Sequence, residues 1–128
     1  MLAFITGASS GIGRDMACYL YKLGYDIIIT ARNEEALQIL KQELEKTRTG
    51  KIYVLPADLS EEQEVIQLYE TIKREFKKID IVINNAGFGL FGRFVQTDLE
   101  TEIKMIYTNI IAVHTLTKLF LQDMLNYN

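Results

Sequence analysis

The amino-acid sequence predicts an α/β fold in which a doubly wound parallel sheet carries helices on both of its faces. Along the 128 residues, short runs of β-branched and other apolar residues alternate with longer segments of helical periodicity. The short runs are apolar on both faces, as are parallel strands buried between two layers of helices. A glycine-rich turn joins the first run to the first helical segment. Right-handed crossovers and the usual order of such sheets then place the four strands in the order 3-2-1-4.

The predicted strands cover residues 2–6, 26–30, 52–56 and 79–84. The segments between them are long enough to hold a helix, which the crossover between two parallel strands requires. We expect Ile81 to Ile83 to lie at an unpaired edge of the sheet, because no fifth strand pattern follows within the sequence. Complete proteins usually cover such an edge, so the predicted sheet is an incomplete one.

Two helices are predicted between the first three strands. The first begins at Gly11 and ends at Leu23, and Gly24 is placed to adopt the left-handed conformation that closes a helix. Asn33 is expected to cap the second helix. The buried side of this second helix carries Leu37, Leu40 and Leu44.

Two further helices follow. The third is predicted to start with a capping box formed by Ser60 and Gln63. Its apolar stripe consists of Val65, Leu68, Tyr69, Ile72 and Phe76. A single last helix is predicted to start at Thr97, with Glu100 as the reciprocal cap. Its apolar residues extend around much of its circumference and comprise Ile103, Ile106, Tyr107, Ile110, Val113, Leu116, Phe120 and Met124. We therefore expect it to pack against more than the sheet.

Composition excludes several classes of function. The formal net charge of -3 argues against a nucleic-acid partner, since such proteins concentrate Lys and Arg to neutralise phosphates. The single cysteine, Cys18, predicts a buried thiol in a reducing compartment. No basic leader or membrane-spanning run is visible, so we expect a cytoplasmic protein without a membrane partner. No linker or repeat divides the chain, so residues 1–128 are expected to belong to one domain.

The turn from Thr6 to Gly13 reads Thr-Gly-Ala-Ser-Ser-Gly-Ile-Gly and carries the main chemical signal. Glycines let the backbone turn tightly, and the helix that follows points its free N–H groups at a ligand. After the first strand of an α/β pattern, this arrangement predicts a site for a dinucleotide pyrophosphate. An ordinary glycine-rich turn is the alternative interpretation. An ATPase loop is excluded, because no Gly-Lys-Ser/Thr follows.

A literal G-x-G-x-x-G pattern occurs elsewhere, from Gly87 to Gly92. A true dinucleotide fingerprint opens directly into a helix, whereas the next capping signal here, Thr97, arrives several residues later. We therefore interpret this segment as a flexible loop beside the ligand cleft.

Arg32 follows the second strand and predicts the kind of dinucleotide. NAD-binding proteins place an Asp or Glu there to bind the ribose 2′-hydroxyl, but this sequence has Thr30-Ala31-Arg32. Arg32, helped by the hydroxyls of Ser9 or Ser10, is placed to meet the 2′-phosphate of NADP. We expect NADP(H) to be preferred and NAD(H) to remain possible. The alternative for Arg32 is a solvated charge near a helix start.

The glycine turn together with Asn84-Asn85-Ala86-Gly87 resembles the short-chain dehydrogenase/reductase family, and the resemblance covers the whole chain. It implies a Rossmann-like fold and hydride transfer between a nicotinamide cofactor and an alcohol or carbonyl substrate. The cofactor-binding residues that it implies, with Arg32 added, are Gly7, Ser9, Ser10, Gly11, Ile12, Gly13, Asp58, Leu59, Asn85, Ala86 and Gly87. Without the resemblance, Asp58 would equally serve as a helix-entry residue, and the asparagines as turn residues.

The resemblance also assigns a catalytic role to Asn109, which distorts its helix locally and helps hold a proton-relaying water. The family's catalytic Ser and Tyr-x-x-x-Lys would follow a fifth strand, outside this sequence. One internal match, Tyr69 to Lys73, is rejected because Tyr69 belongs to the stripe that faces the sheet. No metal site is expected, because His114 is the single histidine and is more typical of a surface or subunit-contact position.

We therefore expect these residues to be the N-terminal part of a single NAD(P)-binding domain whose catalytic part is absent, inactive alone and homo-oligomeric in the complete enzyme. A non-catalytic dinucleotide-binding module that completes its sheet with another chain is the alternative. An S-adenosylmethionine-dependent methyltransferase is weakened by the missing acid after the second strand.

Overall fold

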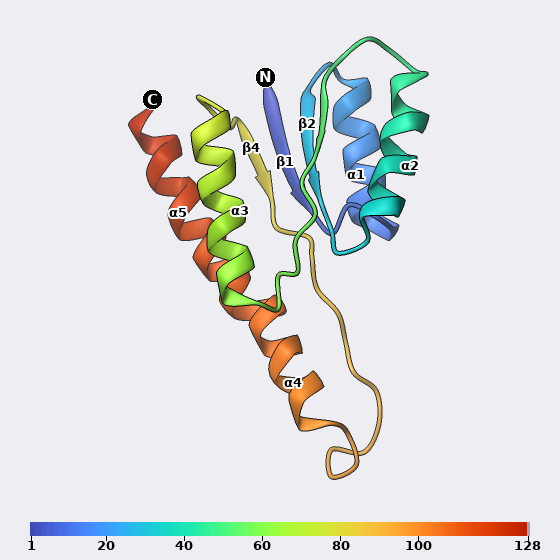
Figure 1. Ribbon diagram of the computed structural model, residues 1–128, viewed down its shortest axis with the longest axis vertical. Coiled ribbons are helices and arrows are strands. Elements are labelled where there is room, and N and C mark those ends of the chain that lie inside the picture. Colours follow the sequence, from blue (N-terminus) through green and yellow to red (C-terminus); the bar gives the residue numbers. More distant parts are fainter. Residues whose placement is uncertain (128) are drawn as a thin grey trace.

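The computed structural model describes residues 1–127, which form a four-stranded parallel sheet with two layers of helices (Figure 1). The strands lie in the order β3-β2-β1-β4, so the predicted order is confirmed. Their bounds are Leu2–Thr6 for β1, Asp26–Thr30 for β2, Ile52–Val54 for β3 and Ile81–Ile83 for β4. In the register of the central strand, Ala3 lies between Ile27 and Ile81.

Two strands are shorter than predicted. After Val54 the chain runs into Pro56, which has no N–H to donate to a sheet ladder. Before Ile81, the N–H of Asp80 still donates to the carbonyl of Leu2 at 2.9 Å, but the N–H of Leu2 donates to the carboxylate of Asp80 at 2.8 Å and not to a strand carbonyl. Within the described chain, β4 pairs with β1 alone and forms one edge of the sheet.

Alternation along β1 and β2 sends side chains into two separate cores. On one face, Ile5 and Ile29 pack with leucines of α2 (Glu34–Glu45) and with α1 (Gly11–Lys22). On the other, Phe4 and Ile28 pack with α3 (Glu62–Glu75) and α5 (Val113–Asn126). Figure 1 shows these helix pairs on opposite sides of the sheet. The turns at the strand ends are therefore carried by a sheet that is packed on both faces.

The predicted ends of the first two helices are confirmed within one residue. Leu23 is the C-cap of α1, and Gly24 follows with a φ of 101°. The Asn33 side chain accepts the N–H of Ala36 at 3.0 Å and caps α2. Cys18, predicted to be buried, is half-buried at the margin of the first core. Cys18 is only half-buried because it follows Ala17, which occupies the fully buried face of α1, and its own side chain therefore points to a neighbouring side of the helix.

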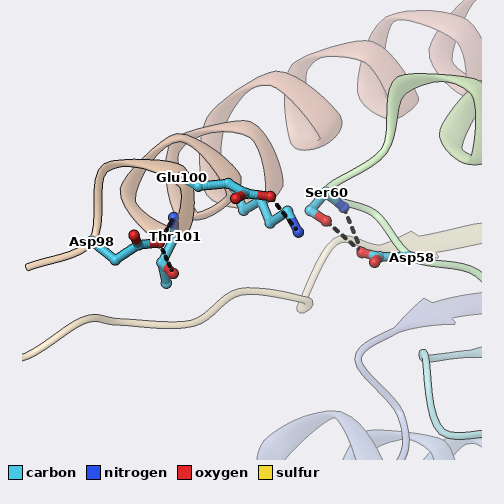
Figure 2. Close-up of polar contacts among 6 residues, drawn as sticks. Asp58, Ser60, Asp98, Glu100 and Thr101 are labelled. Atoms are coloured by element: carbon cyan, nitrogen blue, oxygen red, sulfur yellow. Dashed lines mark hydrogen bonds and ion pairs between the residues drawn. The ribbon is translucent and has the colours of Figure 1, made fainter.

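The predicted capping box of the third helix is wrong. The helix starts at Glu62, and no side chain caps it. Ser60 is engaged elsewhere, because its N–H and its hydroxyl both donate to Oδ1 of Asp58, at 3.0 and 2.7 Å (Figure 2). A carboxylate two residues upstream is the stronger acceptor, so Ser60 forms a turn and Gln63 has no cap partner to complete.

The last predicted helix is divided into three. It comprises α4 (Leu99–Ile106), a π-helical segment η1 (Tyr107–Ala112) and α5. The cap lies one residue later than predicted: Asp98 accepts the N–H and the hydroxyl of Thr101 at 2.9 and 2.7 Å (Figure 2). Thr97 donates its hydroxyl to the carbonyl of Phe94, and Glu100 pairs with Lys104 at 3.5 Å. A carboxylate cap therefore displaces the predicted threonine cap.

Part of the last helical stretch leaves the body of the molecule. In Figure 1, α4 and the loop before it project beyond the strand ends, while α5 lies beside α3. Leu116 and Phe120 of α5 are buried in the second core, but Ile103 of α4 and Ile110 of η1 are 56% and 61% exposed. Beyond the sheet, α5 packs on α3, and Asn109 of η1 bonds the loop that follows β4. Among residues 1–127, no helix combines the length and apolarity that crossing a membrane requires.

Candidate functional site

A cleft of about 690 Å³ opens at the carboxyl ends of the strands, where ligands bind in open parallel sheets. Four connections form it, namely the segments that follow β1, β2, β3 and β4, and Thr108 of η1 adds to the lining. Its lining residues are Gly7, Ser9, Ser10, Ile12, Ala31, Arg32, Asn33, Ala57, Asp58, Leu59, Asn85, Ala86, Gly87, Phe88 and Thr108. The volume lies within the range of small-molecule and cofactor sites.

The glycine turn has a geometry that requires its glycines. Gly7 and Gly11 have φ values of 65° and 56°, in the left-handed region. A Cβ on Gly13 would lie 2.2 Å from the carbonyl oxygen of Gly7, so no side chain fits there. Helix α1 then begins against the preceding turn with the N–H groups of its first residues unpaired.

Ser10 is the N-cap of α1, yet its side chain makes no capping hydrogen bond. This hydroxyl lies on the cleft lining, at the positive end of the helix dipole. A serine in this position normally accepts an N–H of the first helical turn. Its hydroxyl is therefore available to a ligand, as are the helical N–H groups beside it.

Thr6 and Asn85 join the two turns that meet in the cleft. The hydroxyl oxygen of Thr6 accepts the N–H groups of Asn85 and Ala86 at 3.0 and 2.9 Å. In return, Nδ2 of Asn85 donates to the carbonyls of Thr6 and Gly7 at 3.3 and 3.2 Å. This reciprocal link holds the segment after β4 against the glycine turn, so that both present backbone to the same space.

Charges lie at one end of the cleft, with Arg32 after β2 and Asp58 after β3. Partial burial opposes ionisation of Asp58, but the hydroxyl and N–H of Ser60 outweigh it. The positive charges of Arg32 and Lys104 act in the same direction, so the pKa of Asp58 lies below its usual value. Asp58 is thus a fixed carboxylate at neutral pH, with a guanidinium facing the same space.

Asn109 lies in η1 and is bonded to the loop that follows β4. Its Oδ1 accepts the N–H of Phe88 at 3.0 Å, and its Nδ2 donates to the carbonyl of Phe88 at 2.8 Å. The helix is π-helical around Asn109, the kind of local distortion that the resemblance implies. Both polar groups of the side chain are used by the backbone of Phe88, so the side chain positions the loop.

Nearly every predicted cofactor residue lies on the cleft. Gly11 and Gly13 do not line it; they shape the turn behind the lining. Asn109 does not line it either, but it holds Phe88, which does. The prediction missed several lining residues, namely Ala31, Asn33, Ala57, Thr108 and, for this cleft, Phe88. Most adjoin a predicted residue in sequence, whereas Thr108 comes from η1 and only its neighbour Asn109 signalled it.

Tyr69 and Lys73 lie away from the cleft, on α3. The Tyr69 hydroxyl donates to Asp123 of α5 at 2.6 Å, and Lys73 Nζ lies 3.0 Å from that hydroxyl and 2.9 Å from Asp123. Burial and the Asp123 carboxylate raise the pKa of Tyr69, which is opposite to the change a catalytic tyrosine needs. This pair therefore fastens α3 to α5. His114 is exposed on α5, and no metal-binding group of three His, Cys, Asp or Glu occurs among the described residues.

Comparison with known proteins gives a family match over the full chain. The model of the family described as short chain dehydrogenase matches residues 1–128. The chain is 34% identical over 128 residues to dehydrogenase/reductase SDR family member 7 of Mus musculus. That alignment covers 98% of this chain but 38% of the mouse protein, so the chain spans well under half the length of this relative.

Solved structures agree with the fold. The bulky-bulky ketone specific alcohol dehydrogenase of Comamonas testosteroni has a TM-score of 0.87 and 34% identity, over 93% of this chain and 47% of that one. A short-chain dehydrogenase of Sphingobium yanoikuyae in complex with NADPH has a TM-score of 0.87 and 33% identity, over 93% and 46%.

Proposed function

The chain belongs to the short-chain dehydrogenase family of oxidoreductases, and from this premise we propose that it is the NADP(H)-binding part of an enzyme that reduces a carbonyl or oxidises an alcohol. One observation carries the proposal: a single cleft joins the glycine turn and the N-terminus of α1 to Arg32 at one end and to Asn85, Ala86 and Gly87 at the other. A dinucleotide needs these features in this order, because its pyrophosphate lies between its two nucleosides.

The residues present fit such a cofactor. The free hydroxyl of Ser10 and the N–H groups of α1 suit a pyrophosphate, and the turn leaves no room for a side chain at Gly13. Asp58 and Leu59 would flank the adenine ring. Asn85, Ala86 and Gly87 would line the nicotinamide side, with Phe88 held there by Asn109. When bound, the cofactor supplies or accepts a hydride.

NADP(H) is the proposed form, because Arg32 faces the cleft where the 2′-phosphate would lie. The second strand ends Thr30-Ala31-Arg32, without the acid that binds a ribose 2′-hydroxyl. The Sphingobium structure, which resembles this chain in fold and sequence, contains NADPH. NAD(H) would bind without the contact to Arg32 and hence more weakly.

Substitution of Ser10 tests the cofactor site directly. Ser10→Glu places a carboxylate at a helix N-terminus, where the helix tolerates it, but where it repels a pyrophosphate. We expect Ser10→Glu to fold like the wild type, by circular dichroism and denaturation midpoint, and to lose NADPH binding in calorimetric titration. Ser10→Ala is the matched control and should keep most of the affinity. Undiminished NADPH binding by Ser10→Glu would contradict the proposal that the pyrophosphate binds at this turn.

We propose further that residues 1–128 do not turn over alone and that the complete enzyme, a cytoplasmic homo-oligomer, acts on a small alcohol or carbonyl compound. The motivation is that the sequence offers no Tyr-x-x-x-Lys at the cleft, since Tyr69 and Lys73 are bonded to Asp123. The test follows NADPH absorbance with a panel of ketones and aldehydes. Sustained consumption by the isolated chain would show that its own residues complete a catalytic site.

The second candidate function is a non-catalytic dinucleotide-binding module that completes its sheet with another chain. The open edge of β4 favours it, as does Oδ1 of Asn84, which is buried in the described structure without a hydrogen-bond partner. The chain also exposes 8036 Å², against about 6,900 Å² for an average monomer of 14.7 kDa. Light scattering after size exclusion separates the candidates: a discrete dimer that forms with cofactor favours the module, and a monomer argues against it.

A further inference from the structure

Thr108 carries a hydroxyl group that the fold itself does not use. The residue lines the cleft from η1, and 7% of its surface is exposed. Its hydroxyl makes no hydrogen bond to another group of residues 1–127. Within this described part of the chain, Oδ1 of Asn84 is the side-chain polar atom that is sealed from solvent without a partner. The Thr108 hydroxyl is therefore not sealed, and it opens into the cleft that the residue lines.

A hydroxyl group in such a position lowers the stability of the protein. Burial removes water from it, and no hydrogen bond within the chain replaces the bonds to water. A valine side chain has nearly the same shape and would fill the space at Thr108 without this cost. A bound molecule can supply the missing partner, because a hydroxyl both donates and accepts hydrogen bonds. Thr108 therefore has the properties of a ligand-binding residue.

The neighbours of Thr108 in η1 show which side of the cleft it belongs to. Tyr107, the residue before it, packs on the second core, which contains Leu59 of the segment after β3. Burial raises the pKa of the Tyr107 hydroxyl, and the carboxylates of Glu62 and Glu61 at the start of α3 raise it further. The start of η1 thus lies against the segment that was assigned above to the adenine side.

The residue after Thr108 serves a different segment. Asn109 uses both polar groups of its side chain on the backbone of Phe88, in the loop that follows β4. The amide of Asn109 is therefore occupied on the nicotinamide side of the proposed site, while the hydroxyl of Thr108 remains free. Thr108 is the residue of η1 that lines the cleft.

We propose that the Thr108 hydroxyl binds the adenosine part of the dinucleotide, by a hydrogen bond to a ribose hydroxyl or to a nitrogen of the base. The inference rests on the proposed function, because it takes the segment after β3 as the adenine side of the cleft. NADP(H) and NAD(H) share their adenosine part. The contact therefore strengthens the binding of both cofactors and does not choose between them, in contrast to Arg32.

Two substitutions separate ligand binding from packing. Thr108→Val removes the hydroxyl and keeps the shape of the side chain, whereas Thr108→Ser keeps the hydroxyl and removes a methyl group. Thr115→Val, a half-buried position on α5 away from the cleft, is the matched control. Calorimetric titration gives the dissociation constants of NADPH, NADH and adenosine 2′,5′-bisphosphate, which has no nicotinamide part. Urea denaturation without ligand gives the stability of each variant.

We expect Thr108→Val to raise all three dissociation constants by the same factor, roughly fivefold, as the loss of one hydrogen bond between neutral groups predicts. Its urea midpoint should equal or exceed that of the wild type, because the unpartnered hydroxyl is gone. Thr108→Ser should keep the wild-type affinities and lose some stability with its methyl group. Thr115→Val should leave the three constants unchanged. Affinity and stability therefore change in opposite directions in the two Thr108 variants, which a purely structural role would not produce.

The results that would overturn the inference are distinguishable from failure of the cofactor site. If the wild type binds NADPH and Thr108→Val binds it equally well, the inference is wrong and the cofactor site stands. The same holds if Thr108→Val loses affinity for NADPH but not for adenosine 2′,5′-bisphosphate, or if its urea midpoint falls below that of the wild type. If the wild type does not bind NADPH, the proposed function fails, and the inference that rests on it fails with it.

Discussion

The side-chain amide of Asn109 and the peptide groups of Phe88 are joined by two hydrogen bonds, of 3.0 and 2.8 Å, that tie a π-helical turn to the loop after β4. A π-helical turn contains one residue more than an α-helical turn, so it changes the direction in which the side chains around it point. The helical irregularity and the position of the loop are therefore one feature, placed beside the cleft.

Removing this pair should loosen the loop without destroying the fold. Asn109→Leu leaves two exposed peptide groups of Phe88 to water, so we expect a loss of about 1 kcal/mol in the free energy of unfolding and a severalfold weaker binding of NADPH. Chemical denaturation and calorimetry measure the two effects. Asn126→Leu, an exposed asparagine at the end of α5, is the control. Unchanged NADPH affinity in Asn109→Leu would show that the position of this loop does not contribute to cofactor binding.

Arg32 should decide between the two nicotinamide dinucleotides. Arg32→Ala removes a charge-assisted hydrogen bond to the 2′-phosphate, which contributes about 1.5 to 3 kcal/mol, so NADPH affinity should fall roughly tenfold to a hundredfold. NADH affinity should change by less than about twofold, since NADH has no phosphate there. Arg74→Ala, an exposed arginine on α3, serves as control. An equal loss for both cofactors would give Arg32 another role.

The close approach at Gly13 predicts a sharp loss of stability. In Gly13→Ala the new methyl group would lie 2.2 Å from the carbonyl oxygen of Gly7, so the turn must move and we expect a destabilisation of about 3 kcal/mol in urea denaturation. NADPH binding should be lost with the turn. Gly89→Ala adds a methyl group in open space at an ordinary φ and should be neutral. Similar stability of both variants would contradict the packing of this turn.

Asp123 should make stability depend on acid pH. Burial opposes ionisation of this carboxyl, but the Tyr69 hydroxyl and Lys73 outweigh it and hold its pKa below the usual range. A carboxyl whose pKa is lower in the folded than in the unfolded chain stabilises the fold at pH values above its unfolded-state pKa, near 3.9. This contribution is lost as the pH falls through the pKa of the folded state. Asp123→Asn should therefore cost about 1 kcal/mol at pH 7, because the pair lies near the surface, and the difference from wild type should shrink below about pH 4.

Denaturation midpoints from pH 7 down to pH 3 measure this difference, with Asp15→Asn, an exposed aspartate on α1, as the control. Lys73→Met should leave NADPH binding unchanged, because Tyr69, Lys73 and Asp123 lie outside the cleft. A loss of NADPH binding in Lys73→Met would connect this cluster to the site.

The features predicted correctly follow from general rules of topology or from single residues. The strand order follows from the alternation of strand and helix patterns and from right-handed crossovers, while Gly24 after α1 and the Asn33 side chain before α2 each mark a helix end. The glycine turn has the same origin, since its positive φ values at Gly7 and Gly11 are conformations that glycine adopts without strain.

The features predicted wrongly depend on competition between nearby groups. Asp58 takes Ser60 away from its expected cap, and Asp98 caps α4 in place of Thr97. In each case a carboxylate one or two residues away wins over a hydroxyl, which a motif search does not weigh. Thr108 lines the cleft from the π-helical segment η1, which apolar periodicity does not predict, so its neighbour Asn109 was the one signal for it in the sequence.

The most direct measurement is the thermal midpoint of the chain titrated with NADPH and, separately, with NADH. A ligand at 100 times its dissociation constant adds about 2.7 kcal/mol to stability, which is a rise of about 10 °C for a chain of this size. If the cleft binds NADP(H) through the glycine turn and Arg32, NADPH raises the midpoint clearly more than NADH at equal concentration. If neither cofactor raises it, or NADH raises it as much as NADPH, the proposed site or its preference is contradicted.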